Sequence, residues 1–180
     1  MTTEPGARRN VYLIGPRASG KTSLGRALAK RLKRSFVDLD ALAVAKAGES
    51  IAQLVAREGW PAFRKLESGI LAEVAESRDL VAATGGGVIL DAANRERMRS
   101  TGVVVLLWAT PEVLLARLES ERLADQRPAL TELSWEEEMR QTLAQREPLY
   151  RECAHLTLDA ATPLDELTDE AADKLASFRP

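Results

Sequence analysis

The feature that most constrains the fold of this chain is the segment GPRASGKT at residues 15–22, which matches the phosphate-binding pattern G-x-x-x-x-G-K-[ST]. An apolar run at residues 11–14 precedes it, and a helical pattern from about residue 21 to residue 32 follows it. In such a loop, backbone N–H groups and the helix N-terminus receive a phosphate, Lys21 reaches the outer phosphates, and the Thr22 hydroxyl can bind Mg²⁺. The alternative is a chance Gly-Lys turn. The strand before the loop and the helix after it favour nucleotide binding.

The rest of the chain repeats this alternation of short apolar runs and helical patterns. Apolar runs cover residues 11–14, 36–39, 80–83, 103–108 and 155–158. Strands that alternate with helices are typical of a parallel sheet with crossover connections. We therefore predict one doubly wound α/β domain with five strands over residues 11–180, preceded by a flexible tail at residues 1–10.

Helix ends are marked by capping residues and prolines. Ser50 is an N-cap, Pro61 opens a long helix that reaches about residue 78, and Asp91 caps a helix that reaches about residue 100. Ser134 and Glu137 form a capping box for a helix that we expect Pro148 to end. The apolar rhythm is absent from residues 122–133, which are long enough to form a lid.

Composition excludes several classes of function. The 180 residues carry 25 Lys and Arg against 27 Asp and Glu, a net charge of −2, with one His and one Cys. Neither a multi-histidine site nor a thiolate zinc cluster can be built from these, and the lone Cys fits a reducing cytosol. A near-neutral chain is not a general binder of nucleic acids or anionic membranes, and we find no signal peptide or membrane-spanning run. Arg outnumbers Lys by 19 to 6, so the positions of the guanidinium groups matter.

Two aspartates lie at the end of the second apolar run. We expect Asp38 and Asp40 to end that strand with both side chains on one side of it. Because ligands bind at the carboxyl ends of parallel strands, one carboxylate can face a metal and the other a substrate hydroxyl. The alternative is that Asp40 only caps a helix beginning at Ala41.

Two further segments indicate anion or ligand binding. Arg64 lies in the first turn of the helix opened by Pro61, where the helix dipole disfavours a cation unless an anion is bound. The alternative is an ion pair with Glu67 one turn later. Gly85, Gly86 and Gly87 follow the third strand and allow a ligand to lie against bare backbone, although a simple turn would also explain them.

Other polar residues are less informative by themselves. Arg127 falls in the predicted lid, where an arginine can neutralise a transferring phosphoryl group, or can simply be solvated. Arg146 falls in the last turn of the predicted helix before Pro148, where it would offset the helix dipole. His155 and Cys153 fall at the last predicted strand, and we expect both to be packing residues.

Taken together, these segments resemble the shikimate kinase family over about residues 11–158. The segments that carry the resemblance are GPRASGKTSLG, FVDLD, GWPAFRKLE, ATGGGV, QRPAL and QREPLY, in this order and spacing. The resemblance implies transfer of the γ-phosphate of MgATP to the 3-hydroxyl of shikimate, in the chorismate route to aromatic amino acids. It also implies a P-loop fold of the nucleoside-monophosphate-kinase type with a closing lid. We further expect a cytoplasmic location and a monomer.

The resemblance also implies roles for individual residues. The ATP-binding positions are Ala18, Ser19, Gly20, Lys21, Thr22 and Ser23, with Arg127 from the lid on the phosphates and Arg117 near the adenine. The Mg²⁺ positions are Thr22 and Asp38. The shikimate-binding positions are Asp40, Arg64, Gly85, Gly86, Gly87 and Arg146. Lys21, Asp40 and Arg127 match the catalytic positions, and Asp40 acts either as a base or only as an orienting group.

The chain departs from the family pattern at three positions, none of which removes a charge. Ala18 stands where many members have Gly, Leu39 lies between the two aspartates, and Ala129 replaces the usual Leu after Arg-Pro. Two rival hypotheses remain. One is another small-metabolite kinase of this fold, such as a gluconate kinase, and the other is a catalytically silent, ATP-binding regulatory domain.

Overall fold

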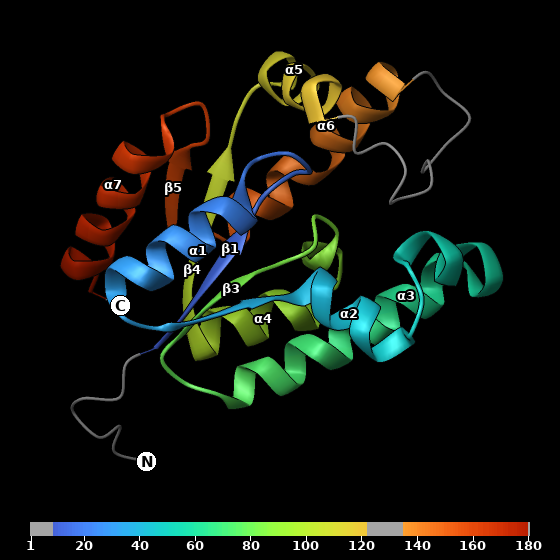
Figure 1. The fold of residues 1–180 in the computed structure, drawn as a ribbon, viewed down its shortest axis with the longest axis horizontal. Coiled ribbons are helices and arrows are strands. Elements are labelled where there is room, and N and C mark those ends of the chain that lie inside the picture. The colour runs from blue at the N-terminus through green and yellow to red at the C-terminus, as the bar shows by residue number, and fades with distance from the viewer. Residues whose placement is uncertain (1–8, 122–134, 180) are drawn as a thin grey trace.

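The computed structural model describes residues 9–121 and 135–179, and its centre is a sheet of five parallel strands (Figure 1). The strands are β1 (Asn10–Ile14), β2 (Ser35–Asp38), β3 (Leu80–Ala83), β4 (Gly102–Trp108) and β5 (Leu156–Asp159). Their order across the sheet is β2-β3-β1-β4-β5. The predicted α/β class and the five parallel strands are therefore confirmed, and β1 begins one residue earlier than expected.

Seven α-helices connect and cover these strands within the described residues. They are α1 (Lys21–Leu32), α2 (Leu39–Ala47), α3 (Ile51–Glu76), α4 (Ala92–Thr101), α5 (Pro111–Glu121), α6 (Trp135–Cys153) and α7 (Leu164–Ser177). A short 3₁₀ turn, η1 (Val88–Leu90), follows the three glycines. None of the helices in the described part of the chain is both long and apolar enough to cross a membrane.

The core lies on both faces of the sheet. Along β1, Val11 and Leu13 belong to a cluster with residues of α1, α5 and α7, while Tyr12 and Ile14 belong to a second cluster with residues of α3 and η1. Alternate residues of a strand point to opposite faces, so a strand covered on both faces is apolar throughout. In Figure 1, α1 and α7 accordingly lie on one side of the sheet and α3 and α4 on the other.

The end of β2 differs from the prediction. The strand stops at Asp38 and α2 begins at Leu39, so Asp40 lies in the first turn of a helix and not on a strand beside Asp38. Asp38 is itself the N-cap, since its Oδ1 accepts from the N–H groups of Asp40 at 3.0 Å and Ala41 at 3.2 Å. Because the helix begins directly after the capping aspartate, the alternation of side chains along a strand does not extend to Asp40.

The end of α6 also differs from the prediction. The helix continues through Pro148 to Cys153, so the expectation that Pro148 ends it is wrong. Tyr150 and Cys153 are buried in the core beyond the proline, and this packing outweighs the hydrogen bond that proline cannot donate. Cys153 therefore ends a helix and His155 precedes β5. Ser134, and with it the predicted capping box, lies outside the described residues.

Helix α3 is interrupted at Gly59, close to Pro61, where the sequence predicted that a helix begins. Ser50 caps its start with a capping box, as its side chain accepts from the N–H of Gln53 and the Gln53 side chain accepts from the N–H of Ser50. Gly59 then has φ 81° and ψ 168°, a conformation that is not helical, and the helix resumes around Pro61. The second half ends at Glu76, two residues before the predicted end. The kink starts a fresh helical segment in front of Arg64.

Candidate functional site

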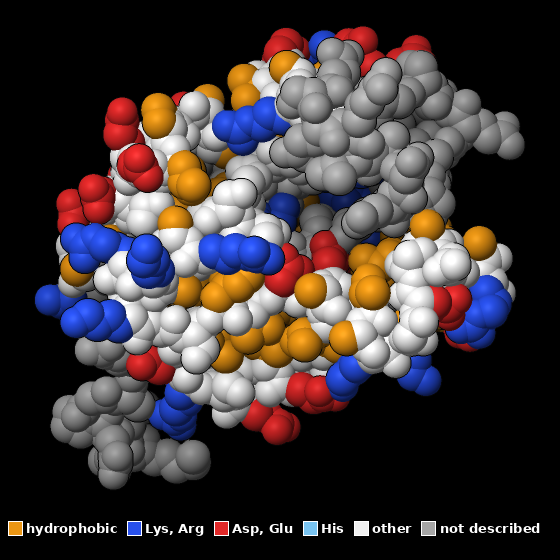
Figure 2. All heavy atoms as spheres, viewed as in Figure 1, with side chains coloured by type: hydrophobic (Ala, Val, Ile, Leu, Met, Phe, Trp, Pro, Cys, Tyr) orange, Lys and Arg blue, Asp and Glu red, His pale blue; other side chains and the backbone are white. Residues whose placement is uncertain are grey.

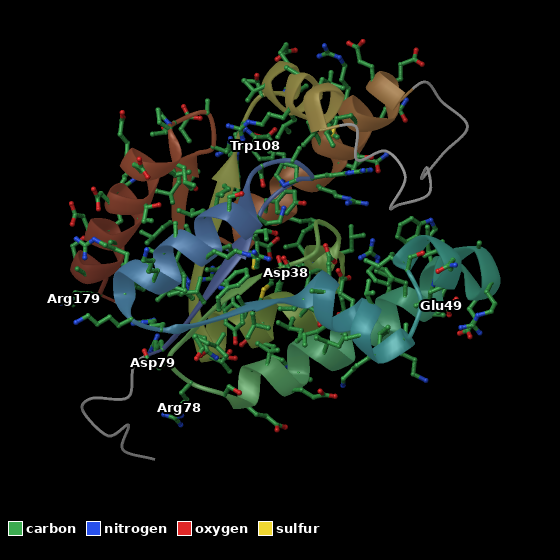
Figure 3. All side chains as sticks on the ribbon, viewed as in Figure 1. Asp38, Glu49, Arg78, Asp79, Trp108 and Arg179 are labelled. Carbon is green, nitrogen blue, oxygen red and sulfur yellow. The ribbon has the colours of Figure 1, made fainter. Side chains whose placement is uncertain are left out.

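The polar residues singled out by the sequence meet at the carboxyl edge of the sheet. The phosphate-binding loop leaves β1, the Asp38 turn leaves β2 and the three glycines leave β3, which lies between them. In Figure 3, Asp38 lies at this edge, while Arg78 and Asp79 lie at the opposite end of the strands. Figure 2 shows a hollow above α2 and α3 in which basic and acidic side chains are both visible.

The phosphate-binding loop has the backbone that its glycines predict. Gly15 has φ 148° and Gly20, the N-cap of α1, has φ 86°. A Cβ on Gly15 would collide with the backbone of Leu107, so close packing also requires glycine there. Ala18 has φ 61°, a left-handed conformation that costs an alanine roughly 1–2 kcal/mol. The chain therefore keeps the loop geometry at a cost that a glycine would avoid.

Lys21 is held against the loop that it follows. Its ammonium donates to the carbonyl oxygens of Gly15 at 3.0 Å and Pro16 at 2.7 Å, and to the Ser19 hydroxyl at 3.3 Å. These contacts keep the cation at the mouth of the loop, where the first turn of α1 carries no acidic residue. A cation and a helix N-terminus that face the same point attract an anion.

Arg117 reaches the same loop from α5. Its guanidinium donates to the carbonyl oxygen of Ala18 at 3.3 Å and to that of Ala160, which follows β5. It also lies 3.9 Å from the position that a Cβ on Gly20 would take. Arg117 thus joins the phosphate-binding loop to the turn between β5 and α7.

A hydroxyl and a carboxylate lie together beside the loop. The Thr22 hydroxyl donates to Oδ2 of Asp38 at 2.8 Å, while Oδ1 of Asp38 caps α2. Both groups are oxygen donors, which Mg²⁺ prefers, and Mg²⁺ in nucleotide sites needs only one or two protein oxygens because phosphates and waters complete its shell. Within the described residues no cluster of three metal-ligating His, Cys, Asp or Glu side chains exists.

The outer two of the three glycines, Gly85 and Gly87, are required by the side chains around them. A Cβ on Gly85 would collide with the carboxylate of Glu67 and lie 2.9 Å from Oδ1 of Asp40. A Cβ on Gly87 would overlap the guanidinium of Arg64. Gly87 has φ −102°, so the missing side chain, and not an unusual backbone, explains this glycine. The run is a bare strip of backbone with carboxylates against one end and a guanidinium against the other.

Arg64 is fixed on the helix by charge and by aromatic rings. Its Nη1 lies 2.5 Å from Oε2 of Glu67, whose side chain is only 3% exposed. Its guanidinium lies 5.2 Å from the Trp60 ring centroid and 5.1 Å from that of Phe63. The pairing with Glu67 that the sequence offered as an alternative is therefore present. It orients Arg64 toward Gly87 and does not withdraw it from the site.

Arg146 approaches the same turn from α6. Because α6 continues to Cys153, Arg146 does not lie in its last turn, and the expectation that it merely offsets the helix dipole is wrong. Its Nη1 donates to the carbonyl oxygen of Gly86 at 3.3 Å. Burial lowers the pKa of Arg146, and the nearby charge of Arg64 lowers it further. Two guanidinium groups thus face one turn and repel each other.

Some predicted residues lie elsewhere. Arg127 and the predicted lid fall outside the described residues. Ser23 remains beside the phosphate-binding loop, in the first turn of α1 directly after Thr22, but its side chain is exposed. His155 accepts a hydrogen bond at Nδ1 from the N–H of Val104 at 3.0 Å, and Cys153 is buried. Both are therefore held in the packing of the fold, as expected.

Two residues of the site were not assigned to it from the sequence. Glu67 occupies the buried stripe of α3 with Phe63 and Ile70, and an acidic residue on an apolar stripe is a signal that could have identified it. Tyr150, which donates to the carbonyl oxygen of Gly86, lies four residues after Arg146 and so on the same helix face. Ending the predicted helix at Pro148 concealed that relation.

A phosphate-binding loop beside a second polar site, at the carboxyl edge of a five-stranded parallel sheet, defines the P-loop kinases as the class of this protein. The sequence model of the shikimate kinase family matches residues 17–176. The chain therefore belongs to the shikimate kinase family.

Individual relatives agree with this assignment. Shikimate kinase 2 of Sodalis glossinidius is 44% identical over 167 residues, which cover 93% of this chain and 95% of that protein. Shikimate kinase of Oleidesulfovibrio alaskensis is 42% identical over 93% of this chain and 97% of its own length. The shikimate kinase of Acinetobacter baumannii, solved in complex with shikimate, superposes with a TM-score of 0.88 at 37% identity, covering 94% of each chain. A gluconokinase of Sinorhizobium meliloti has a TM-score of 0.57 at 21% identity, covers 93% of this chain and 91% of its own, and shares the fold.

Proposed function

We propose that this chain transfers the γ-phosphate of ATP to the 3-hydroxyl of shikimate, giving shikimate 3-phosphate and ADP. The observation that carries the proposal is the convergence of Asp40, Arg64 and Arg146 on one three-glycine turn beside the phosphate-binding loop. Shikimate has one carboxylate and three hydroxyls. Two guanidinium groups and one carboxylate match these groups in charge and in hydrogen bonding. The Acinetobacter baumannii relative, solved with shikimate, supports the same substrate.

Arg64 and Arg146 are proposed to bind the carboxylate of shikimate. Each guanidinium lies at the glycine turn, and their mutual repulsion contributes to the lowered pKa of Arg146. An anion between them replaces this repulsion by attraction, and each arginine can offer two parallel N–H donors to it. The glycine turn, with Gly86 at its centre, then lies against the ring of the substrate, because it has no side chains that would separate the two.

Asp40 is proposed to orient the hydroxyl that attacks. Its carboxylate lies beside Gly85, at the end of the glycine turn away from Arg64. The hydroxyl oxygen forms the new bond to the γ-phosphorus while the bond to the β-phosphate oxygen of ADP breaks. The proton leaves the hydroxyl for the Asp40 carboxylate after the O–P bond has begun to form, because a loose transition state needs little earlier deprotonation.

The phosphate-binding loop is proposed to hold the triphosphate. Backbone N–H groups surround the phosphates. They belong to Ala18, Ser19, Gly20, Lys21, Thr22 and Ser23. The Lys21 ammonium then donates to phosphate oxygens in place of the loop carbonyl oxygens. Thr22 and Asp38 would hold Mg²⁺, directly or through water, and a bound Mg²⁺ would neutralise phosphate charge. Arg117 is proposed to lie near the adenine.

Arg127 is proposed to approach the phosphates from the lid segment at residues 122–133. An arginine there neutralises the charge of the transferring phosphoryl group and acts on the transition state more than on the bound substrate. Arg127→Ala should therefore lower kcat by at least about tenfold with little change in the KM for shikimate. An unchanged kcat would remove Arg127 from the reaction.

We also propose that residues 11–180 form a single domain and that the protein is a monomer. We place it in the cytoplasm, with no nucleic acid or membrane partner. The net charge of −2 supports the lack of nucleic-acid and membrane partners, and the single Cys153 fits a reducing cytoplasm. Sedimentation of the purified protein at working concentration tests the monomer.

A coupled assay of ADP release tests the proposed function. We expect release that requires both Mg²⁺ and shikimate. Asp40→Asn should lower kcat by about 10²-fold or more, and Arg64→Lys, which keeps a charge beside Glu67, should raise the KM for shikimate by about tenfold. Lys46→Ala is the matched control, because Lys46 is an exposed cation on α2 whose ion pair with Glu73 lies away from the glycine turn.

The rival hypotheses predict different results in the same assay. A gluconate-kinase-like enzyme releases ADP with gluconate at a rate equal to or above that with shikimate, and the gluconokinase above supports only the shared fold. A silent regulatory domain binds ATP and releases no ADP with either acid. The acidic and basic groups at Lys21, Asp38 and Asp40 favour the active enzyme.

A further inference from the structure

The carbonyl group of Gly86 is held differently from those of its two neighbours. The carbonyls of Gly85 and Gly87 accept from N–H groups within the same turn, namely those of Val88 at 3.2 Å and Leu90 at 3.0 Å. The carbonyl of Gly86 accepts instead from α6, where Tyr150 donates through its hydroxyl at 2.5 Å and Arg146 through Nη1 at 3.3 Å. The middle of the glycine turn is thus anchored from a separate element.

We propose that Tyr150 is a positioning residue for the acceptor substrate: its hydroxyl fixes the Gly86 peptide so that the glycine turn is already in its binding conformation. This rests on the proposed function of the same site. Three successive glycines have more backbone freedom than any other sequence and no side chains of their own to pack. An external donor on the central carbonyl restricts this freedom, and a restricted turn loses less entropy when the substrate binds.

Tyr150 is better suited to hold the Gly86 carbonyl than Arg146, which donates to the same oxygen. The Arg146 guanidinium is a charged group proposed to turn toward the substrate carboxylate, so its bond to Gly86 competes with substrate binding. Tyr150 carries no charge, is only 1% exposed, and its ring packs edge-on against Trp108 at 6.2 Å. When Arg146 engages the substrate, the tyrosine hydroxyl keeps the carbonyl in place.

Fixing the Gly86 carbonyl also fixes the N–H of Gly87, because the two groups share one peptide plane. The carbonyl of Gly86 and the N–H of Gly87 belong to one rigid peptide unit and point in opposite directions. Fixing the carbonyl toward α6 therefore fixes the Gly87 N–H away from it. Gly87 is also the residue that lies against Arg64. One hydroxyl thereby sets the orientation of a backbone donor next to the arginine that we propose binds the substrate carboxylate.

The hydroxyl remains a donor throughout the useful pH range. Burial raises the pKa of Tyr150 to about 12, so the group stays protonated at any pH at which the protein would be assayed. Loss of the hydroxyl should therefore change substrate binding by the same factor at every pH. A role in proton transfer would instead alter the pH profile.

Tyr150→Phe tests the proposal, and Tyr12→Phe is its matched control. Tyr12 is also a fully buried tyrosine, and its hydroxyl is paired with that of Thr101 at 2.8 Å, near the amino end of the sheet and far from the glycine turn. Both variants keep the ring and remove the hydrogen bonds of one buried hydroxyl, which in Tyr12 also accepts from Nδ2 of Asn10 at 3.2 Å, so thermal unfolding should show a loss of stability in both. Only Tyr150→Phe should raise the KM for shikimate, by about fivefold, which corresponds to one hydrogen bond.

The result is decided by comparing the two substrates and the two variants. We expect Tyr150→Phe to leave the KM for ATP within about twofold of the wild type, and Tyr12→Phe to leave both KM values unchanged. A shikimate KM that does not rise in Tyr150→Phe, or that rises equally in Tyr12→Phe, overturns the positioning role alone. A wild-type protein with no shikimate-dependent ADP release overturns the proposed function, and the positioning role with it.

Discussion

At the scale of single residues, the glycine turn shows how absent side chains shape a site. Gly85 and Gly87 are adjacent to charged groups that would overlap a Cβ, whereas a Cβ on Gly86 would lie at ordinary contact distances, 3.5–3.7 Å, from the phosphate-binding loop and Tyr150. The outer glycines therefore make room for protein side chains. The central glycine instead lies at contact distance from the phosphate-binding loop and Tyr150.

Gly87→Ala should weaken shikimate binding through Arg64. The new methyl overlaps the end of a flexible side chain, so we expect the guanidinium to move while the fold persists. The KM for shikimate should rise by about tenfold, with a change in unfolding free energy of about 1 kcal/mol or less. Steady-state kinetics and urea denaturation measure the two quantities.

A double mutant separates this indirect effect from a direct one. If Gly87→Ala acts by displacing Arg64, it should add little to the KM of an Arg64→Lys background, because both changes remove the same interaction. Equal factors in both backgrounds would mean that the methyl obstructs the substrate itself.

At the scale of elements, two helices bring their functional residues to the site by departing from regular geometry. Helix α3 is kinked at Gly59, and α6 continues through Pro148. The kink starts a new helical segment that presents Arg64 and Glu67 to the glycine turn. The continuation places Arg146 and Tyr150 one turn apart on the same face.

Gly59→Ala should damage α3, and Gly69→Ala in the same helix is its control. Gly59 has a backbone conformation that is almost restricted to glycine, with only Pro61 near the added methyl, so the cost is conformational, at about 1–3 kcal/mol. Gly69 is exposed, has no positive φ and has no atom within 4 Å of an added Cβ. Its replacement should stabilise the helix by about 0.4–1 kcal/mol.

Urea denaturation of the two variants checks this prediction. Because Arg64 follows the kink, Gly59→Ala should also raise the KM for shikimate, and Gly69→Ala should leave it unchanged. A Gly59→Ala protein as stable as the wild type would show that the kink carries no strain for alanine.

At the scale of the whole molecule, the charge balance conceals a local excess. The chain carries a net charge of −2, yet Lys21, Arg64 and Arg146 lie at one edge of the sheet. Low-dielectric walls strengthen the field of these groups, and acidic residues elsewhere offset the total. A near-neutral protein can therefore bind an anionic nucleotide and an anionic acid without attracting polyanions in general.

The stability of the whole fold should fall in mild acid because of His155. Burial lowers its pKa from the usual 6.5, and the charges of Arg99 and Arg9 lower it further. Its Nδ1 accepts from the N–H of Val104, so protonation there breaks a bond to a central strand. The unfolded chain then binds more protons than the folded one, and this contribution to stability is complete above about pH 6.5 and is lost as the pH falls below it.

His155→Asn provides the comparison. The Asn side-chain oxygen can accept from Val104 near the position of Nδ1 and does not titrate. Urea denaturation at pH 7, 6 and 5 should show a smaller loss of unfolding free energy in the variant than in the wild type. Parallel losses in both proteins would assign the acid sensitivity to other groups.

Much of this protein is determined by local sequence. The GPRASGKT loop, the alternating apolar runs and the cap at Ser50 predict the parallel sheet, the α1 boundaries and the start of α3, because each depends on backbone preference and periodicity over a few residues. The sequence also singled out Lys21, Arg64 and Asp40, because lysine and arginine attract phosphates and carboxylates and an aspartate accepts from a hydroxyl.

Only the tertiary structure decided how those residues meet. Whether Pro148 ends α6, and whether Arg146 faces solvent or the glycine turn, depend on packing between segments far apart in the chain. Burial of Tyr150 and Cys153 outweighed the local effect of a proline, and it carried a tyrosine hydroxyl onto the carbonyl of Gly86, 64 residues away. Most local helix preferences are worth up to about 1 kcal/mol and a proline inside a helix costs about 3 kcal/mol, whereas burial of several large side chains contributes more in total. Long-range contacts therefore determined the geometry of the site.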